Sequence, residues 1–259
     1  PDFLALLQGV IDSPDIPLNV SRSALQSDSN VKKISSHISK KVSDRLKDMF
    51  KKDRSDFEQK WKDMNIIVEY GMLSDDKFYD RSQDFCLYKT VDDKFYTIDE
   101  FTEIIQEKQK NKDGKLVYLY TNNTDSQHMY ISKAKEKGYE VLVLDSPIVS
   151  HVIQKLESKL SDASFVRVDG DIVDNLIKKD SKIESVLSDK EQDKLKGLFE
   201  KSLPKDGFLV SFEPLNPSSS PITITQSEFM RRMKEMSVTG GGPMMGMGNM
   251  PDTYNVVIN

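Results

Sequence analysis

Two short runs of strand-forming residues, separated by a helical pattern, most constrain the fold of this chain. The runs are LVYLY, residues 116–120, and YEVLVL, residues 139–144. The helical pattern between them closes near Gly138, and glycine is common just after a helix. A strand, a helix and a strand of these lengths predict a βαβ unit with parallel strands and a right-handed crossover. A further helix from Pro147 and a strand at 165–168 complete a small α/β layer domain.

Four capping boxes predict where helices begin, because a Ser or Thr followed three residues later by Glu or Gln satisfies two free backbone N–H groups. They lie at residues 97–100, 124–127, 188–191 and 225–228. Near the last two boxes the pattern changes to a helix followed by two strands, 208–215 and 222–225. This part of the chain therefore predicts a small α+β domain.

The residues before the α/β layer predict a helical connector. Apolar residues recur at spacings of three and four over residues 31–50, which is the stripe of an amphipathic helix. A second helix is expected at 56–65, with the lone Trp61 in its core, and residues 70–86 are expected to be irregular. Cys86, between two large apolar residues, is expected to be a buried small side chain.

These patterns divide the chain into three parts. Residues 1–169 hold the helical connector and the small α/β domain, 170–188 form a charged linker with one helical turn near 172–177, and 189–259 begin an α+β domain. The predicted fold class is thus an α/β layer (αβα) domain followed by a smaller α+β domain.

Composition excludes several classes of protein. The 259 residues carry 37 basic and 42 acidic side chains, for a net charge of −5, whereas a general nucleic-acid binder needs a basic excess. A single cysteine allows no internal disulfide and fits a reducing compartment. No apolar run approaches the roughly 20 residues that span a bilayer. We expect a cytoplasmic protein that binds neither nucleic acid nor membrane.

An arginine follows an extended apolar run in the segment IPLNVSRSALQ, residues 16–26. Arg22 is expected at the entrance of a helix, where its guanidinium, with five donors and a permanent charge, suits an anion. Gln26 lies four residues on, so both side chains leave one helical face and could reach one ligand. The alternative is that Arg22 pairs with a nearby carboxylate and Gln26 is solvated.

Methionines are concentrated near the end of the chain. Met230 and Met233 lie on the last predicted helix, where core packing is the simple interpretation. A glycine-rich run then contains Met244, Met245, Met247 and Met250, and flexible unbranched side chains of this kind suit an adaptable apolar contact surface.

We find no catalytic motif in the α/β layer. It lacks a dinucleotide or phosphate glycine motif and a nucleophile elbow, and the three histidines, His37, His128 and His151, have no metal-ligand spacing. His151, on the helix after Pro147, is the histidine we regard as a candidate functional residue. We predict no metal site in this chain.

Several segments resemble one known family along essentially the whole chain. These segments are FLALLQGVIDSPDI and PLNVSR, then KLVYLYTNN and KAKEKGYEVLVL, and finally TYNVVIN. Together they are similar to the ninety-kilodalton heat-shock chaperones in their bacterial HtpG form. The chain resembles the later part of the middle segment and the start of the C-terminal segment. The family's ATP-binding domain is expected before Pro1 and its dimerising helices after Asn259.

The resemblance implies a function. The full-length protein would be a homodimeric chaperone and ATPase that uses ATP and Mg²⁺, binds unfolded or partly folded client polypeptides and docks its own N-terminal domain, whereas this fragment alone would be inactive. Arg22 would reach the ATP γ-phosphate, with Gln26 and Asn19 positioning the loop. The family's client-contacting region corresponds to the methionine-rich segment, and we add His151 to the candidate contacts. The alternative is a protein-interaction adaptor that does not use nucleotide.

Overall fold

The structure, a computed structural model, describes residues 1–5, 29–177, 185, 187–204, 207–215, 219–239 and 252–259. Packing divides the chain into two compact units, Pro1–Tyr88 with Phe95–Glu100, and Lys89–Lys94 with Phe101–Asn259. Helices and two mixed sheets confirm the predicted combination of α/β and α+β folds. The limits predicted for the domains of the full-length protein stay a prediction.

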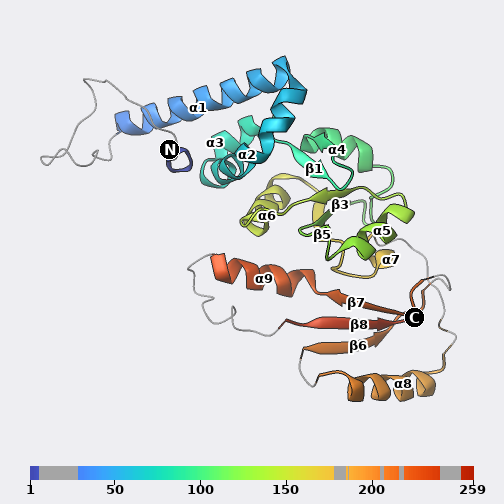
Figure 1. Ribbon diagram of the computed structural model, residues 1–259. Helices are drawn as coiled ribbons and strands as arrows, with labels where there is room; N and C mark the ends of the chain where they lie inside the picture. The colour runs from blue at the N-terminus through green and yellow to red at the C-terminus, as the bar shows by residue number, and fades with distance from the viewer. Residues whose placement is uncertain (6–28, 178–184, 186, 205–206, 216–218, 240–251) are drawn as a thin grey trace, which may run out of the picture. The chain divides into compact units, whose positions relative to one another are not determined.

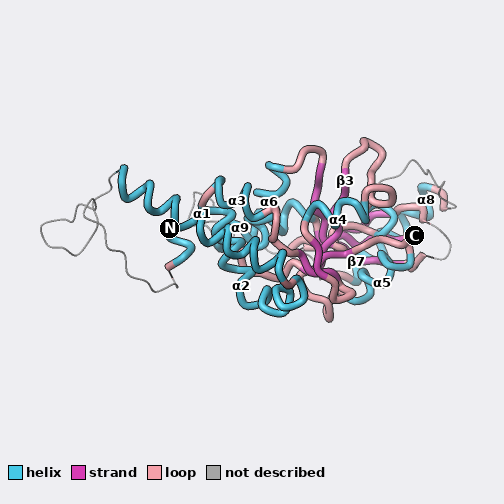
Figure 2. The backbone as a smooth tube through the Cα atoms, turned by 90° about the horizontal axis from the view of Figure 1, so that it is seen from above, coloured by secondary structure: helices cyan, strands magenta, loops and turns pink. Residues whose placement is uncertain are grey.

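The first unit is mainly helical. Its helical elements are the turn η1 (Asp2–Leu4), α1 (Ser29–Lys52), α2 (Arg54–Ser74) and α3 (Asp76–Ser82), and Figure 2 shows α1, α2 and α3 in the helix colour. The amphipathic helix predicted at 31–50 is confirmed as α1. The prediction of an irregular 70–86 segment is wrong, because α2 continues to Ser74 and α3 follows. Asp75 separates the two helices: its N–H bonds Gly71 and its carboxylate caps Lys77 and Phe78.

Aromatic side chains from α2 and the following segment form the core of this unit. Trp61 is buried and packs on Phe57, with ring centroids 5.7 Å apart, which confirms its predicted core position. Cys86 is buried as predicted, and its Sγ lies 3.7 Å from the sulfur of Met72. Asp53 caps the start of α2 by accepting from the N–H of Asp56, and Arg54 ties this end of the helix to Glu100 through two hydrogen bonds.

The second unit begins with an α/β layer, as the sequence predicts. Its elements in chain order, with those that it shares with the first unit, are β1 (Tyr88–Thr90), β2 (Phe95–Tyr96), α4 (Ile98–Ile105), β3 (Leu116–Thr121), α5 (His128–Glu136), β4 (Val141–Val143), α6 (Val149–Lys159), β5 (Ala163–Arg167) and α7 (Val173–Leu176). The sheet order is β2-β1-β4-β3-β5, and β3 is parallel to both β4 and β5. The predicted parallel βαβ unit is therefore confirmed, whereas β1 and β2 were not predicted.

Helices cover both faces of this sheet. On one face Val117 and Leu119 pack with apolar residues of α5 and α7 in one core cluster. On the other face Tyr118 stacks on Phe165, with centroids 4.6 Å apart. Figure 1 shows α6 on the opposite side of the sheet from α5 and α7. This arrangement follows from right-handed crossovers that leave β4 and β3 in opposite directions across the sheet.

The remainder of the second unit is a small α+β part. Its elements are α8 (Asp189–Ser202), β6 (Phe208–Phe212), β7 (Ile222–Gln226), α9 (Glu228–Thr239) and β8 (Tyr254–Ile258). The sheet order is β6-β8-β7, so the last strand lies in the middle, parallel to β6 and antiparallel to β7. Phe199 and Leu203 pack against Val210, Val256 and Ile258, which form the core of this part.

Two of the four predicted capping boxes are confirmed. Thr97 exchanges hydrogen bonds with Glu100, and Ser188 forms a complete box with Glu191. The box at Thr124 is wrong, because α5 begins only at His128. The box at Thr225 is also wrong: this residue is buried in β7, opposite Asn255 of β8, and α9 starts at Glu228. A β-branched residue with a strand partner stays in the sheet despite its helix-start spacing.

Candidate functional site

The predicted nucleotide contacts cannot be placed in the structure. Asn19, Arg22 and Gln26 lie outside the described residues. Their roles stay predictions from the sequence. The later methionines Met244, Met245, Met247 and Met250 also lie outside the described residues.

Helix α9 carries the described part of the predicted client-contacting region. Met230 is 40% exposed and Met233 is half-buried, so the predicted core packing fits Met233 better than Met230. The preceding residue, Phe229, is 69% exposed and was not among the contacts predicted from the sequence. Phe229 and Met230 are consecutive exposed apolar residues in the first turn of α9, and we treat them as a candidate contact surface. We call Phe229 and Met230 the apolar pair.

A cavity of about 530 Å³ lies between the α/β layer and α9. One wall comes from the loops that follow the carboxyl ends of β3 and β4 and from the end of β5. The opposite wall comes from α9 and from the residues next to β7 and β8. Its lining includes His151 with Asp145, Ser146, Ser150, Arg167, Gln226, Arg231, Lys234, Glu235, Asp252 and Tyr254. Crevices at the carboxyl ends of parallel strands are common ligand-binding positions in α/β folds.

Arg167, which lines this cavity, forms an ion pair with Asp169. Arg167 is 8% exposed in its side chain and donates to Asp169 through Nε, at 2.5 Å, and through Nη2, at 2.8 Å. Nη2 also donates to Gln226 Oε1 at 2.9 Å, which ties the end of β5 to the end of β7. A bidentate pair of this kind fixes geometry as well as adding energy.

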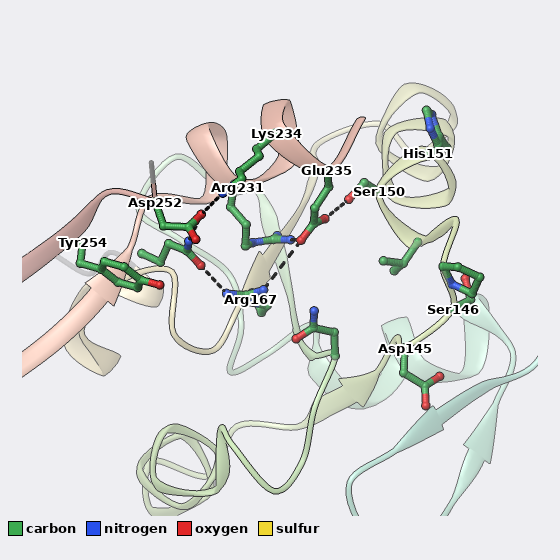
Figure 3. A pocket seen from close by; sticks show the side chains of 14 residues that line it. Asp145, Ser146, Ser150, His151, Arg167, Arg231, Lys234, Glu235, Asp252 and Tyr254 are labelled. Carbon is green, nitrogen blue, oxygen red and sulfur yellow. Dashed lines mark hydrogen bonds and ion pairs between the residues drawn. The ribbon is translucent and has the colours of Figure 1, made fainter. Parts of the chain in front are cut away.

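Arg231 of α9 lines the opposite wall of the cavity from Arg167. Its side chain is 5% exposed and donates to Glu228 at 2.6 Å, to Glu235 at 2.5 Å and to the hydroxyl of Tyr120. Ser150 of α6 donates to the other oxygen of Glu235. Figure 3 shows Glu235 between Ser150 and Arg167, while Asp145 and His151 lie apart from these contacts.

The neighbouring Arg232 joins α9 to α6 and β5. It donates to Glu228 at 2.6 Å and to Glu157 of α6 at 2.8 Å, and it also bonds the carbonyl oxygen of Phe165. Arg231 and Arg232 thus donate to the same carboxylate oxygen, Oε1 of Glu228, which also accepts from the hydroxyl of Tyr120. Glu228 is the common partner of both.

Charge and burial act in opposite directions on Glu228. Burial alone would raise the pKa of this carboxyl group, but Arg231, Arg232 and the hydrogen bond from Tyr120 outweigh it and hold the pKa below its ordinary value. Burial, reinforced by the charge of Glu228, raises the pKa of Tyr120. At neutral pH the carboxylate is therefore ionised and the phenol is protonated.

This arrangement binds elements together rather than activating a nucleophile. The carboxylates of Glu228 and Glu235 are occupied by arginine and hydroxyl donors. In the described parts of the chain, no group of three His, Cys, Asp or Glu residues could hold a metal ion. The helices described there also lack the length and apolarity to cross a membrane. Glu228, Arg231, Arg232 and Glu235 of α9 thus form a network of ion pairs and hydrogen bonds that we call the polar joint. The exposed apolar pair lies on the same helix.

Sequence reasoning missed this polar joint. The spacing of Glu228, Arg231 and Arg232 was a usable signal, because residues three and four apart share one helical face. Their partners in β3, β5 and α6 could not be found from local spacing. Of the sequence candidates, the structure places Met230 and Met233 on α9 and His151 at the cavity, and only His151 lines that cavity.

Comparison with known proteins gives the family. The model of the Hsp90 protein family matches residues 1–234. Chaperone protein htpG of Bacteroides fragilis strain YCH46 is 52% identical over 262 aligned residues, and Chaperone protein HtpG of Porphyromonas gingivalis strain ATCC 33277 is 51% identical over the same length. Both alignments cover 100% of this chain and 38% of the relative. HtpG of Bdellovibrio bacteriovorus is 36% identical over 160 residues, or 60% of this chain and 25% of that protein.

The chain therefore spans well under half the length of the curated relatives it matches. The family match runs from residue 1 into α9 and includes the resembling segments except the last, TYNVVIN, which the whole-chain alignments to the HtpG relatives cover. The fold agrees with the predicted α/β layer and the α+β part that follows it. On this evidence the chain belongs to the Hsp90 family.

Proposed function

We propose that the full-length protein is an ATP-dependent chaperone, active in the stress response, that holds unfolded or partly folded polypeptides. The relatives that are about half identical over the whole chain are named as chaperones. The observation that carries the client-binding part is the apolar pair, Phe229 at 69% and Met230 at 40% exposure. Transfer of one such side chain from water into a contact contributes roughly 1.5–3 kcal/mol.

The client-binding proposal can be tested on the full-length protein. The double substitution Phe229→Ser and Met230→Ser should weaken binding of reduced, carboxymethylated α-lactalbumin by at least about tenfold in fluorescence anisotropy. The matched control is Leu198→Ser, since Leu198 is 55% exposed on α8. Equal binding by the double variant and the wild type would remove the apolar pair from the proposal.

The nucleotide part of the proposal rests on the sequence. Arg22 is proposed to contact the ATP γ-phosphate from the middle segment, where a fixed positive charge stabilises the developing charge of phosphoryl transfer. Gln26 and Asn19 are proposed to position its loop. ATP and Mg²⁺ would be held by an N-terminal domain, and the working form is proposed to be a cytoplasmic homodimer.

The test is ATP turnover by the full-length protein with Arg22→Ala. We expect turnover to fall at least tenfold, about 1.4 kcal/mol of barrier, while nucleotide affinity changes little. Lys33→Ala, an exposed lysine on α1, is the control for removal of a nearby charge. Unchanged turnover would make Arg22 a structural ion-pair partner, and a full-length protein that binds clients without hydrolysing ATP would favour the adaptor alternative.

A further inference from the structure

The outer edge of the five-stranded sheet is covered by side chains instead of a strand. The sheet ends at β5, and in a parallel ladder alternate residues of an edge strand point their backbone groups outward. Phe165 and Arg167 occupy outward positions. The N–H of Phe165 donates to Glu157 at 2.8 Å, and the N–H of Arg167 donates to Glu228 at 3.2 Å. The carbonyl oxygen of Phe165 accepts from Arg232.

The three covering side chains are bonded to one another in the same order. Arg232 donates to Glu157 at 2.8 Å and to Glu228 at 2.6 Å, so it lies between the two carboxylates. We call Glu157, Arg232 and Glu228 the edge triad. Along β5, the N–H of Phe165 donates to Glu157, the carbonyl oxygen of Phe165 accepts from Arg232, and the N–H of Arg167 donates to Glu228. The triad thus presents an acceptor, a donor and an acceptor in turn. A neighbouring β-strand would present the same alternation through its backbone.

A polypeptide backbone could take the place of this triad. The triad side chains are between 17% and 27% exposed, so they lie at the rim and have water within reach when they move. Partly buried ion pairs lose much of their attraction to desolvation, and their net contribution is often small. Exposed strand edges, in contrast, pair readily with other chains, and natural proteins cover them with charged side chains or helices.

We propose that the β5 edge is a strand-addition site for an extended segment of a non-native polypeptide, and that the edge triad closes it. The proposal rests on the client-binding function proposed above and adds the mode of recognition. The apolar pair lies between Glu228 and Arg231 in the sequence of α9, but its exposed side chains leave another face of the helix than the edge triad does, so the pair and the strand edge would contact different parts of one client. Backbone pairing gives affinity without demanding a particular sequence, which suits a protein that binds many unfolded chains.

The test opens the edge without leaving a lone buried charge. The double substitution Glu157→Leu and Arg232→Met, in the full-length protein, removes the ion pairs of Arg232 with Glu157 and with Glu228, and leaves Glu228 with Tyr120 and Arg231. The matched control is Lys234→Met with Asp252→Leu, which removes another ion pair of α9, at 2.8 Å, that does not include a residue of the edge triad. The probe is a labelled heptapeptide of alternating Thr and Val, compared with the same peptide carrying N-methyl groups on all central amides.

We expect the edge variant to bind the unmethylated peptide about tenfold more tightly than the wild type, and the control variant to match the wild type. The methylated peptide, which cannot pair as a strand, should bind all three proteins equally weakly. In hydrogen exchange, the amide of Phe165, which loses its acceptor Glu157, should exchange faster in the edge variant and be protected again by the unmethylated peptide. Equal binding of the two peptides by the edge variant, or no protection of this amide, would overturn the proposal.

Two further measurements keep the result interpretable. If the double variant fails to fold, Glu157→Gln replaces it, because this substitution keeps the side-chain length and one acceptor oxygen. Glu157→Gln should raise the affinity for the unmethylated peptide about threefold, and no rise would count against the proposal. Binding of carboxymethylated α-lactalbumin by the wild type separates the two proposals. If the protein binds it through the apolar pair but the peptide experiments fail, only strand addition is wrong, whereas no binding at all removes the client-binding function itself.

Discussion

The hydroxyl of Tyr120 donates a hydrogen bond of 2.8 Å to the carboxylate of Glu228, a residue 108 positions further along the chain. The bond joins the central region of the α/β sheet to the first turn of α9. Arg231 lies over the ring of the same tyrosine, 5.8 Å from its centroid, and donates to its hydroxyl. The α+β part is therefore held by polar contacts with strict geometry, and their removal has measurable consequences.

The pair of Arg167 and Asp169 should be important for stability. Asp169→Ala should lower the free energy of unfolding by about 3–5 kcal/mol, because it leaves a buried guanidinium without its bidentate partner. The control is Asp56→Ala, which breaks an exposed ion pair between Asp56, 49% exposed, and Lys60, 52% exposed. This substitution should lower the free energy of unfolding by less than about 1 kcal/mol. Urea unfolding of both variants measures the difference, and similar losses would show that burial does not distinguish the two pairs.

Two glycines should respond oppositely to alanine. A Cβ at Gly71 would lie 2.7 Å from the ring of Phe78 and 2.9 Å from that of Phe3, so Gly71→Ala should destabilise the protein by about 1–3 kcal/mol. At Gly197, inside α8, a Cβ has no neighbour within 4 Å. Gly197→Ala should therefore stabilise the protein by roughly 0.5–1 kcal/mol. Thermal unfolding of each variant reports the sign, and equal signs would contradict the packing around Gly71.

Stability should depend on the ionisation of Glu228 in acid. Its folded-state pKa is lowered by Arg231 and Arg232 against the effect of burial, and unfolded glutamate titrates near about 4.3. The stability that ionised Glu228 contributes is therefore present above about pH 4.3 and is lost as the pH falls through the lower folded value. Glu228→Gln should be less stable at neutral pH, and its difference from the wild type should shrink below pH 4. A constant difference across that range would mean that the carboxylate does not titrate with folding.

Cys86 should resist modification in the native protein. Burial raises the pKa of its thiol to about 12, so almost no thiolate is present at pH 8. Iodoacetamide should label Cys86 only after unfolding in guanidinium chloride, as followed by mass spectrometry. Rapid labelling of the native protein would show that the core around Met72 opens readily.

Local patterns predicted much of the fold. The stripe over residues 31–50 became α1, and the runs at 116–120 and 139–144 became parallel strands β3 and β4. These features depend on periodicity and strand propensity, which act over a few residues. One miss has a local cause, because Asp75 caps α3 within segment 70–86. The other does not, because Thr225 stays in a strand through its pairing with Asn255 of β8, which is distant in the sequence.

Some residues of the candidate site could be predicted from the sequence, and others could not. The methionines of α9 and His151 were identifiable from residue type, while Phe229 was overlooked and the nucleotide contacts Asn19, Arg22 and Gln26 stay predictions. Arg231 and Arg232 looked like two ordinary helical charges. Nothing in their immediate neighbourhood indicates that one would bond Tyr120 and the other Glu157 and the backbone of Phe165.

The sequence by itself determined the family, the order of helices and strands, and the apolar stripes that build each core, because these depend on residue type and spacing. Only the tertiary structure decided that α9 closes the edge of β5 and that two arginines share Glu228. Those contacts join residues up to 111 positions apart. Their energies depend on burial and on hydrogen-bond angles, which exist only once the chain has folded.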